Sequence, residues 1–212
     1  MKKYGIILCA AVLVVVVALA AFWFTKGEDS SEALPQEGPL ELAVIDGEPF
    51  VIDGGFDALK MQTLLYGGAS VSDRIQFLVE QEVIAEKAEE EGITVSDEEV
   101  QVYVDEWISM YRGIESDDSE GFQIYERMLA EMGLTDEEFF RMFSDCYRSE
   151  LLAGKYRDML KENVERDASG STDFQSYWQE TKEKLIKEAD VRYSDAYFQA
   201  ADIDLSDIYS RK

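Results

Sequence analysis

Residues 92–100 have the sequence GITVSDEEV, and residues 133–139 repeat its order of residue types as GLTDEEF. In each copy a glycine is followed by an apolar residue, a hydroxyl residue, an acidic run and a bulky apolar residue. A glycine with positive φ often follows the last turn of a helix, and a hydroxyl residue with glutamate three positions later forms a capping box that begins one. We therefore predict that both copies are junctions between helices. The predicted N-caps are Ser96 and Thr135, and the glutamates that complete the boxes are Glu99 and Glu138.

A hydrophobic staple is predicted at each junction as well. Val95 precedes the first cap and Val100 follows it at the fourth helical position. Leu134 and Phe139 hold the same places at the second cap. The acidic runs suit the positive ends of helix dipoles, and their spacing does not match the alternating oxygen ligands of an EF-hand loop. Two copies are too few for a helical repeat protein, so the stretch is predicted to mark helix boundaries.

Outward from these junctions, the fold is predicted to be mainly α, with a small β-hairpin near its start. Apolar residues recur at helical spacing in successive segments. The predicted helices span residues 56–66, 71–91, 97–112, 119–132, 136–163 and 173–189. The predicted apolar face of the third helix contains Val100, Tyr103, Val104, Trp107, Met110 and Tyr111. Asp46 and Gly47 lie between short apolar runs and predict a tight hairpin turn, and VRY at 191–193 predicts a closing strand.

The N-terminal region predicts a membrane anchor. Residues 5–24 are an uncharged apolar run whose length as a helix is about one bilayer crossing. Lys2 and Lys3 precede the run. The positive-inside rule then predicts that residues 1–4 are a cytoplasmic stub and that the rest of the chain, after one transmembrane helix, is extracytoplasmic.

Residues 25–40 are rich in Gly, Pro, Ser and acidic residues, which predicts a flexible linker between the anchor and the domain. The alternative is a cleaved signal peptide, because the ALA at residues 18–20 resembles a cleavage site. Cleavage near Ala20 produces a secreted protein instead of a membrane protein.

The charge of the chain restricts its partners. The chain has 20 basic and 45 acidic residues and a formal net charge of −25. Such a field disfavours nucleic acid and anionic membrane surfaces, whereas basic or partly unfolded polypeptides and divalent cations are compatible with it. The chain contains no histidine, and Cys146 is its only cysteine beyond the predicted anchor, so no disulfide is expected within the domain. No catalytic residue, metal site or cofactor is predicted.

The order of these parts resembles a known family. The stretches that carry the resemblance are VIDGEPFVI (44–52), RIQFLVEQEVIAEKAEEEGITVSDEEVQVYVDEW (74–107) and YERMLAEMGLTDEEFFRMFSDCYRSELLAGKYRDML (125–160). They are similar to the N-terminal chaperone domain of exported foldases of the SurA/PrsA class, with Gly47, Glu48 and Pro49 in the family's turn and Asp46 in place of its usual asparagine. The resemblance implies a helical chaperone domain over residues 41–193, followed by a tail over residues 194–212.

One departure from the family bears on activity. Members that isomerise prolyl bonds carry a parvulin domain between the long helix and the returning C-terminal helix, and its active site typically uses histidines. Here only VERDASGSTD (164–173) separates the two helices. The resemblance therefore implies a membrane-anchored, ATP-independent holdase for unfolded or partly folded exported polypeptides, without prolyl isomerase or other enzyme activity. The alternative is a scaffold or interaction protein at the membrane surface.

The candidate binding residues are aromatic and methionine side chains, because both types adapt to varied apolar partners. Family members bind client chains in an apolar cradle between helices, and the residues predicted to line it here are Met110, Tyr111, Met142 and Tyr147. Neither the client nor the oligomeric state follows from the sequence.

Overall fold

The computed structural model describes residues 38–66, 70–113, 120–167, 173–203 and 205. All of them belong to one compact unit, Gln36–Lys212. The predicted anchor (5–24) and nearly all of the predicted linker (25–40) lie outside the described residues. Among the helices that the structure does describe, none is both long and apolar enough to cross a membrane.

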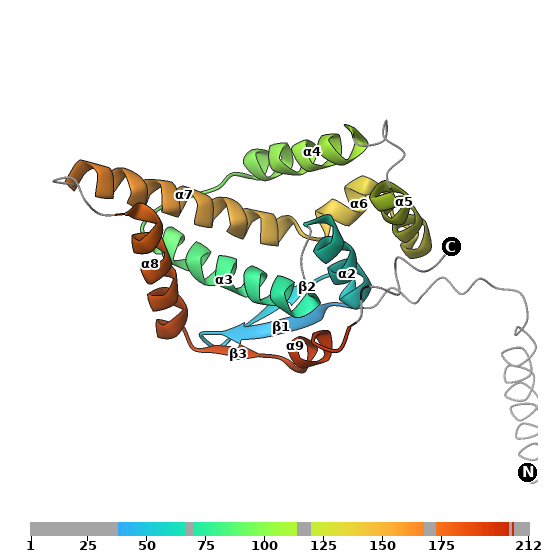
Figure 1. Cartoon of the computed structure of the whole chain (residues 1–212), viewed down its shortest axis with the longest axis horizontal. Coiled ribbons are helices and arrows are strands. Elements are labelled where there is room, and N and C mark those ends of the chain that lie inside the picture. Colours follow the sequence, from blue (N-terminus) through green and yellow to red (C-terminus); the bar gives the residue numbers. More distant parts are fainter. Residues whose placement is uncertain (1–37, 67–69, 114–119, 168–172, 204, 206–212) are drawn as a thin grey trace, which may run out of the picture. The chain divides into compact units, whose positions relative to one another are not determined.

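The described part of the chain is mainly helical, with one small sheet, as predicted (Figure 1). The strands are β1 (Leu40–Ile45), β2 (Glu48–Ile52) and β3 (Val191–Tyr193). The helices are α2 (Gly55–Leu65), α3 (Val71–Glu90), α4 (Asp97–Gly113), α5 (Glu120–Met132), α6 (Asp136–Arg141), α7 (Ser144–Asp167), α8 (Phe174–Glu188) and α9 (Asp195–Ala200).

The sheet joins the two ends of the folded unit. Strands β1 and β2 form the predicted antiparallel hairpin, and its turn residues Asp46 and Gly47 have φ values of 48° and 95°. Positive φ at both positions matches the twist of a two-residue hairpin. The predicted closing strand β3 pairs antiparallel with the other edge of β1, which gives the order β2-β1-β3. The Asp46 carboxylate accepts a hydrogen bond from the Asp190 N–H at 2.9 Å, so the hairpin turn also holds the start of β3.

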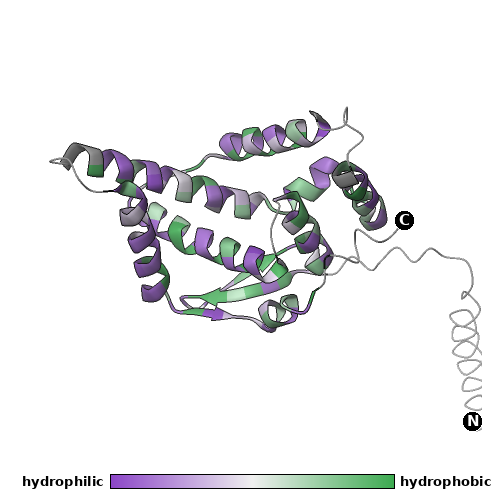
Figure 2. Ribbon diagram, viewed as in Figure 1, coloured by the Kyte–Doolittle hydropathy of each residue, from purple (hydrophilic) through white to green (hydrophobic). Residues whose placement is uncertain are grey.

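The core lies between the sheet and the helices, where α3 and α7 run beside each other and α8 crosses them (Figure 1). Figure 2 shows β1 and β2 as largely hydrophobic, whereas the helices mix hydrophobic and hydrophilic residues. The fully buried large side chains include Leu42, Ile45, Leu59, Met61, Ile75, Leu78, Phe139, Phe140, Phe143 and Tyr147. A smaller cluster beside α8 contains Ile84, Ala85, Ala88, Leu152, Ala153, Tyr156 and Trp178.

Both predicted junctions have the expected helix endings. Gly92 and Gly133 have φ values of 79° and 67°, in the left-handed region. After the first, the Ile93 N–H donates to the Ala88 carbonyl at 3.0 Å, and after the second the Leu134 N–H donates to Leu129 at 3.0 Å. These are the reversed hydrogen bonds of a Schellman motif, which satisfy the last carbonyls of α3 and α5.

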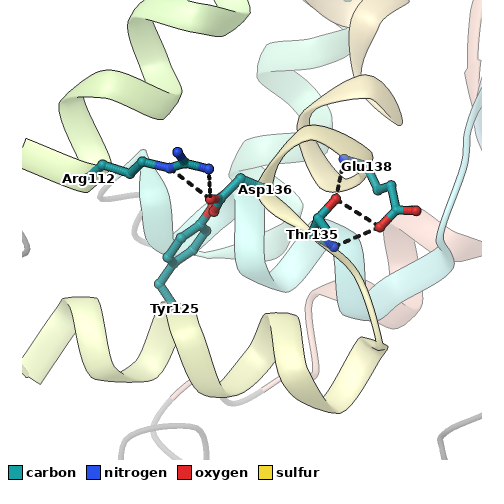
Figure 3. Close-up of polar contacts among 5 residues, drawn as sticks. All are labelled: Arg112, Tyr125, Thr135, Asp136 and Glu138. Atoms are coloured by element: carbon teal, nitrogen blue, oxygen red, sulfur yellow. Dashed lines mark hydrogen bonds and ion pairs between the residues drawn. The ribbon is translucent and has the colours of Figure 1, made fainter.

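Both capping boxes are confirmed as well. The Thr135 N–H donates to the Glu138 carboxylate at 2.8 Å, and the Glu138 N–H donates to the Thr135 hydroxyl at 3.3 Å (Figure 3). The corresponding distances between Ser96 and Glu99 are 2.9 and 3.2 Å. Each pair supplies partners to backbone N–H groups that a helix start otherwise leaves unpaired.

The single helix predicted over residues 136–163 is wrong, because the chain forms α6 and α7 with a break at Met142 and Phe143. The Phe143 N–H bonds to the carbonyl three residues back, at Phe140, so the helix tightens there. The Ser144 hydroxyl donates to the Arg141 carbonyl at 2.7 Å. Such a side-chain bond competes with the regular helical bond and allows the chain to change direction.

The folded unit continues beyond residue 193, because Asp195–Ala200 of the predicted tail form helix α9. The Ser194 hydroxyl accepts a hydrogen bond from the Ala196 N–H at 3.2 Å and caps α9. Helix α9 packs against β1 and α3, and Ala200 is 1% exposed. Burial of this small side chain explains why the short helix is part of the domain.

Candidate functional site

Eight aromatic rings meet where α2, α4, α5, α6 and the start of α7 come together, and we call them the aromatic cluster. Its members are Tyr66, Tyr103, Trp107, Tyr111, Phe122, Tyr125, Phe140 and Tyr147. Every neighbouring pair has ring centroids between 4.7 Å, for Tyr66 and Trp107, and 6.3 Å, for Phe122 and Tyr125. Aromatic pairs at such distances contribute about 0.5–1.5 kcal/mol each beyond the burial of their area.

Helix α4 supplies the middle of the cluster. Tyr103, Trp107 and Tyr111 are spaced four residues apart, so they lie along one side of the helix. Trp107 stacks against Tyr111 at 5.8 Å and meets Tyr103 edge-on at 6.2 Å. The predicted apolar face of this helix is therefore confirmed for these three residues.

The cluster has a buried base and a half-buried rim. Phe140 and Tyr147 are 0% exposed, and Tyr125 is 3% exposed. The rim side chains are partly accessible to solvent, and they are Tyr66, Tyr103, Trp107, Tyr111 and Phe122. A partner can therefore contact the rim directly, whereas the base supports it from below.

Polar contacts link the helices around the cluster. The Tyr111 hydroxyl donates to the Leu65 carbonyl at the end of α2. Asp136 of α6 accepts hydrogen bonds from the Tyr125 hydroxyl of α5 and, at 2.9 Å, from Arg112 of α4 (Figure 3). Burial raises the pKa of Tyr111 to about 12, and burial followed by the Asp136 carboxylate raises that of Tyr125. Both hydroxyls therefore remain protonated donors at neutral pH.

A buried ion pair lies beneath the cluster. Arg74 of α3 and Glu150 of α7 are 2.9 Å apart, with side chains 5% and 9% exposed. The guanidinium also donates to the Gln62 amide oxygen at 3.0 Å and lies over the Tyr66 ring at 3.8 Å from its centroid. The Tyr103 hydroxyl donates to Glu150 at 3.1 Å, which ties α4 to the ion pair.

This ion pair is shielded from solvent. Burial raises the pKa of Glu150, although Arg74 and Tyr103 act in the opposite direction. Among the described residues, the Tyr66 and Tyr147 hydroxyls and the Gln62 Nε2 have no hydrogen-bond partner of good geometry. Removing one charge of such a pair is strongly destabilising, because the other charge then stays buried without a partner.

The structure separates the four predicted binding residues. Tyr111 lies in the rim and Tyr147 in the base, and Phe140 connects them with centroid distances of 6.1 and 6.3 Å. Tyr147 cannot contact a client in this conformation because it is fully buried.

The two methionines have different environments. Met142 is half-buried in the break between α6 and α7, where a Cβ added to Gly54 would lie 1.8 Å from the Met142 Cε. Met110 is 46% exposed, so its predicted place on the apolar face of α4 is wrong. Ile108, which is 9% exposed, occupies the inner side of that turn instead.

Sequence reasoning missed Gln62, Arg74 and Glu150. They come from three different helices, and 76 positions separate Arg74 from Glu150. In a chain with 45 acidic residues, nothing local distinguishes Glu150, whose side chain is buried, from the exposed carboxylates.

The described residues contain no group of three or more His, Cys, Asp or Glu side chains placed to hold a metal ion. Cys146 is buried, and burial raises the pKa of its thiol. A thiol in this state is a poor nucleophile, since the thiolate is the reactive form.

No protein-family model, curated protein or solved structure matches the chain. The resemblance to the SurA/PrsA class therefore stays a prediction from the quoted stretches.

Proposed function

We propose that this domain is an ATP-independent holdase that binds unfolded or partly folded exported polypeptides through the rim of the aromatic cluster. The observation that carries the proposal is the half-buried row of Tyr103, Trp107 and Tyr111 on α4. Aromatic side chains give large contact area at low cost in conformational entropy, and they dominate the energetics of many recognition sites.

The construction of the rim supports this proposal. Buried rings lie beneath it, and the hydrogen bond from the Tyr111 hydroxyl to the Leu65 carbonyl holds its edge. A supported aromatic surface loses little freedom when a chain binds, which favours affinity. The acidic surface elsewhere keeps domains apart, which suits a protein that must stay soluble while it holds sticky clients.

We further propose that the domain works on the extracytoplasmic side of the membrane, anchored through residues 5–24. An anchored protein stays in the membrane fraction and retains Met1 as its first residue. Recovery of a soluble form that begins near Ala21 contradicts anchoring and favours the secreted alternative.

Light scattering of aggregating clients tests the holdase proposal. The buried core lies within Gln36–Lys212, so residues 36–212 are suitable for the assay. Two unrelated denatured proteins, one acidic and one basic, are diluted into buffer that contains the domain. Suppression of aggregation for both clients is expected. If the domain suppresses aggregation of neither client, the result contradicts the proposal and favours the scaffold alternative.

A pair of variants assigns the activity to the rim. Trp107→Ala removes a rim ring, and we expect about 2 kcal/mol weaker client binding, a typical loss for an aromatic anchor. Phe198→Ala is the matched control, because Phe198 is 64% exposed and belongs to α9, a helix on the other side of α3 and α7 from α4 (Figure 1). Circular dichroism establishes that both variants are folded. Equal activity of the two variants places the site elsewhere.

A further inference from the structure

The side of α4 that faces away from the core carries exposed apolar and acidic residues together, and we call it the α4 outer face. It consists of Glu98, Val102, Asp105, Glu106 and Met110, whose helical spacing places them on one continuous surface. Val102 is 52% exposed and Met110 is 46% exposed. The large hydrophobic side chains that are exposed among the described residues are Val51, Phe77, Val102, Met110 and Phe198, so two of them share this face.

Ion pairs with other described residues do not neutralise the carboxylates of the α4 outer face. Two other carboxylates of α4, Asp97 and Glu99, pair with cations of α7 at 2.6 Å each. Glu98, Asp105 and Glu106 take part in no ion pair within the described part of the chain. Asp105 accepts only a neutral hydrogen bond from the Gln101 amide, at 2.8 Å. The face therefore presents a negative field around an apolar pair.

We propose that the α4 outer face binds a basic amphipathic segment of a client polypeptide. Lysine or arginine side chains of the segment pair with the carboxylates, while an apolar side chain packs on Val102 and Met110. This inference rests on the proposed function and specifies the class of client that the domain prefers.

Charge complementarity selects this occupant over the others. A second copy of the chain, a nucleic acid and an anionic lipid surface are all negatively charged, and a net charge of −25 repels them. A basic segment is attracted, and complementary charge mainly accelerates its association and makes binding depend on salt.

The position of the face explains how it serves the aromatic cluster. Trp107 and Tyr111 lie on the inner side of the same helix, so one helix offers charge on one side and aromatic rings on the other. A client that is first attracted to the carboxylates is thereby held close to the rim. Basic clients should accordingly bind faster than acidic ones at low salt, and the difference should shrink as salt is added.

Binding of two labelled amphipathic peptides tests the inference by fluorescence anisotropy. The peptides have equal length and identical apolar positions, with lysine at the polar positions of one and glutamate in the other. The α4 variant is Asp105→Lys with Glu106→Lys. The matched control is Glu180→Lys with Glu183→Lys on α8, which changes the net charge by the same amount. Like Asp105, Glu183 accepts a hydrogen bond from a glutamine amide, that of Gln179 at 3.0 Å.

We expect the basic peptide to bind wild type and the α8 variant with similar affinity and the α4 variant about tenfold more weakly, since several modest exposed charge contacts are reversed. Equal weakening in both variants assigns binding to net charge and overturns the inference. Unchanged binding in the α4 variant also overturns it, as does equal binding of the acidic peptide to wild type. Met110→Ser with Val102→Ser should also weaken binding of the basic peptide. If this variant binds the peptide as wild type does, the apolar part of the proposal is wrong.

The scattering assay separates this inference from the proposed function. If the α4 variant suppresses aggregation of both clients as wild type does, the inference fails and the holdase proposal stands. If wild type suppresses neither client, the holdase proposal itself fails.

Discussion

The two junctions at residues 92–100 and 133–139 have the same order of helix-ending and helix-starting residue types, but different parts of the molecule hold them. Helix α7 holds the first, where Arg148 donates to the Val95 carbonyl at 2.7 Å and Lys155 donates to the Thr94 carbonyl at 2.8 Å. The second is held by α4 and α5, through Arg112 and Tyr125 on Asp136 (Figure 3).

The difference shows how local and tertiary information divide. The caps depend on residues within a few positions, so the two similar sequences form the same kind of cap. The tertiary partners of the first junction lie more than 50 residues away, and nothing in GITVSDEEV specifies them. The first junction is part of the paired α3–α7 layer, whereas the second belongs to the helices around the aromatic cluster.

The largest expected difference between the junctions lies in their staples. Phe139 is 0% exposed, and Phe139→Ala should lower the free energy of unfolding by about 3–5 kcal/mol through lost burial and a cavity. Val100 is 5% exposed, and Val100→Ala removes two methyl groups, each worth about 0.8 kcal/mol. Urea denaturation of the domain measures both. Equal losses contradict the view that the second junction carries more of the core.

The helix-ending glycines should behave alike. Gly92→Ala and Gly133→Ala should each cost about 1–2 kcal/mol, because a side chain at positive φ is strained. An added Cβ meets nothing within 4 Å at either position, so backbone strain is the whole cost. Gly154→Ala in α7 is the control, because its Cβ also meets nothing, and it should stabilise the helix by about 0.5–1 kcal/mol. A large inequality between Gly92 and Gly133 in the same urea titrations rejects local equivalence.

The N-caps should also contribute equally. Ser96→Ala and Thr135→Ala each remove the side-chain acceptor of one N–H group, and each should lower the unfolding free energy by about 1 kcal/mol. Ser109→Ala, at an exposed position within α4, provides a control expected to change stability little. Thermal unfolding of the three variants checks this ranking. If Ser109→Ala destabilises the domain as much as the two cap variants do, the ranking is wrong.

The smallest effect distinguishes the two glutamates of the capping boxes. Hydrogen bonds from Lys155 and Ser96 lower the pKa of Glu99 to about 2. Hydrogen bonds from the backbone N–H and the hydroxyl of Thr135 lower the pKa of Glu138. A carboxyl whose pKa is lowered by folding stabilises the folded state above pH 4.5. For Glu99 this stabilisation is lost gradually as the pH falls from 4.5 to about 2. Lys155→Met should raise the pKa of Glu99, leave Glu138 unchanged and reduce the loss of stability over that range. Carbon NMR titration of the side-chain carboxyls measures both pKa values. An equal pKa shift in both glutamates contradicts the view that Lys155 acts on Glu99 alone.

Much of the fold was predictable because its signals are local. The hairpin turn at Asp46 and Gly47, both capping boxes and the bounds of α3, α4 and α8 follow from residues close in sequence. The break after Arg141 was missed because Ser144 is one hydroxyl residue inside a continuous apolar pattern. Helix α9 was missed because its burial depends on β1, which lies about 150 residues earlier.

The candidate site was predictable only in part. Spacing on α4 placed Trp107 and Tyr111 on one side, but it could not show which aromatic residues stay accessible. Tyr147 is buried because other helices pack over it, and Met110 is exposed because its side of α4 faces away from the core. Periodicity within one helix does not contain this information. The Arg74–Glu150 pair beneath the cluster depends on the docking of α3 against α7.

Tryptophan fluorescence tests the central claim, that the aromatic rim binds unfolded chains, most directly. Residues 36–212 contain two tryptophans, Trp107 in the rim and Trp178 in the smaller cluster beside α8. Trp178→Phe leaves Trp107 as the only reporter, and Trp107→Phe leaves Trp178. We predict that a permanently unfolded, tryptophan-free polypeptide changes the emission of Trp107 in a saturable way and leaves that of Trp178 unchanged. No change at Trp107, or a change confined to Trp178, contradicts the account.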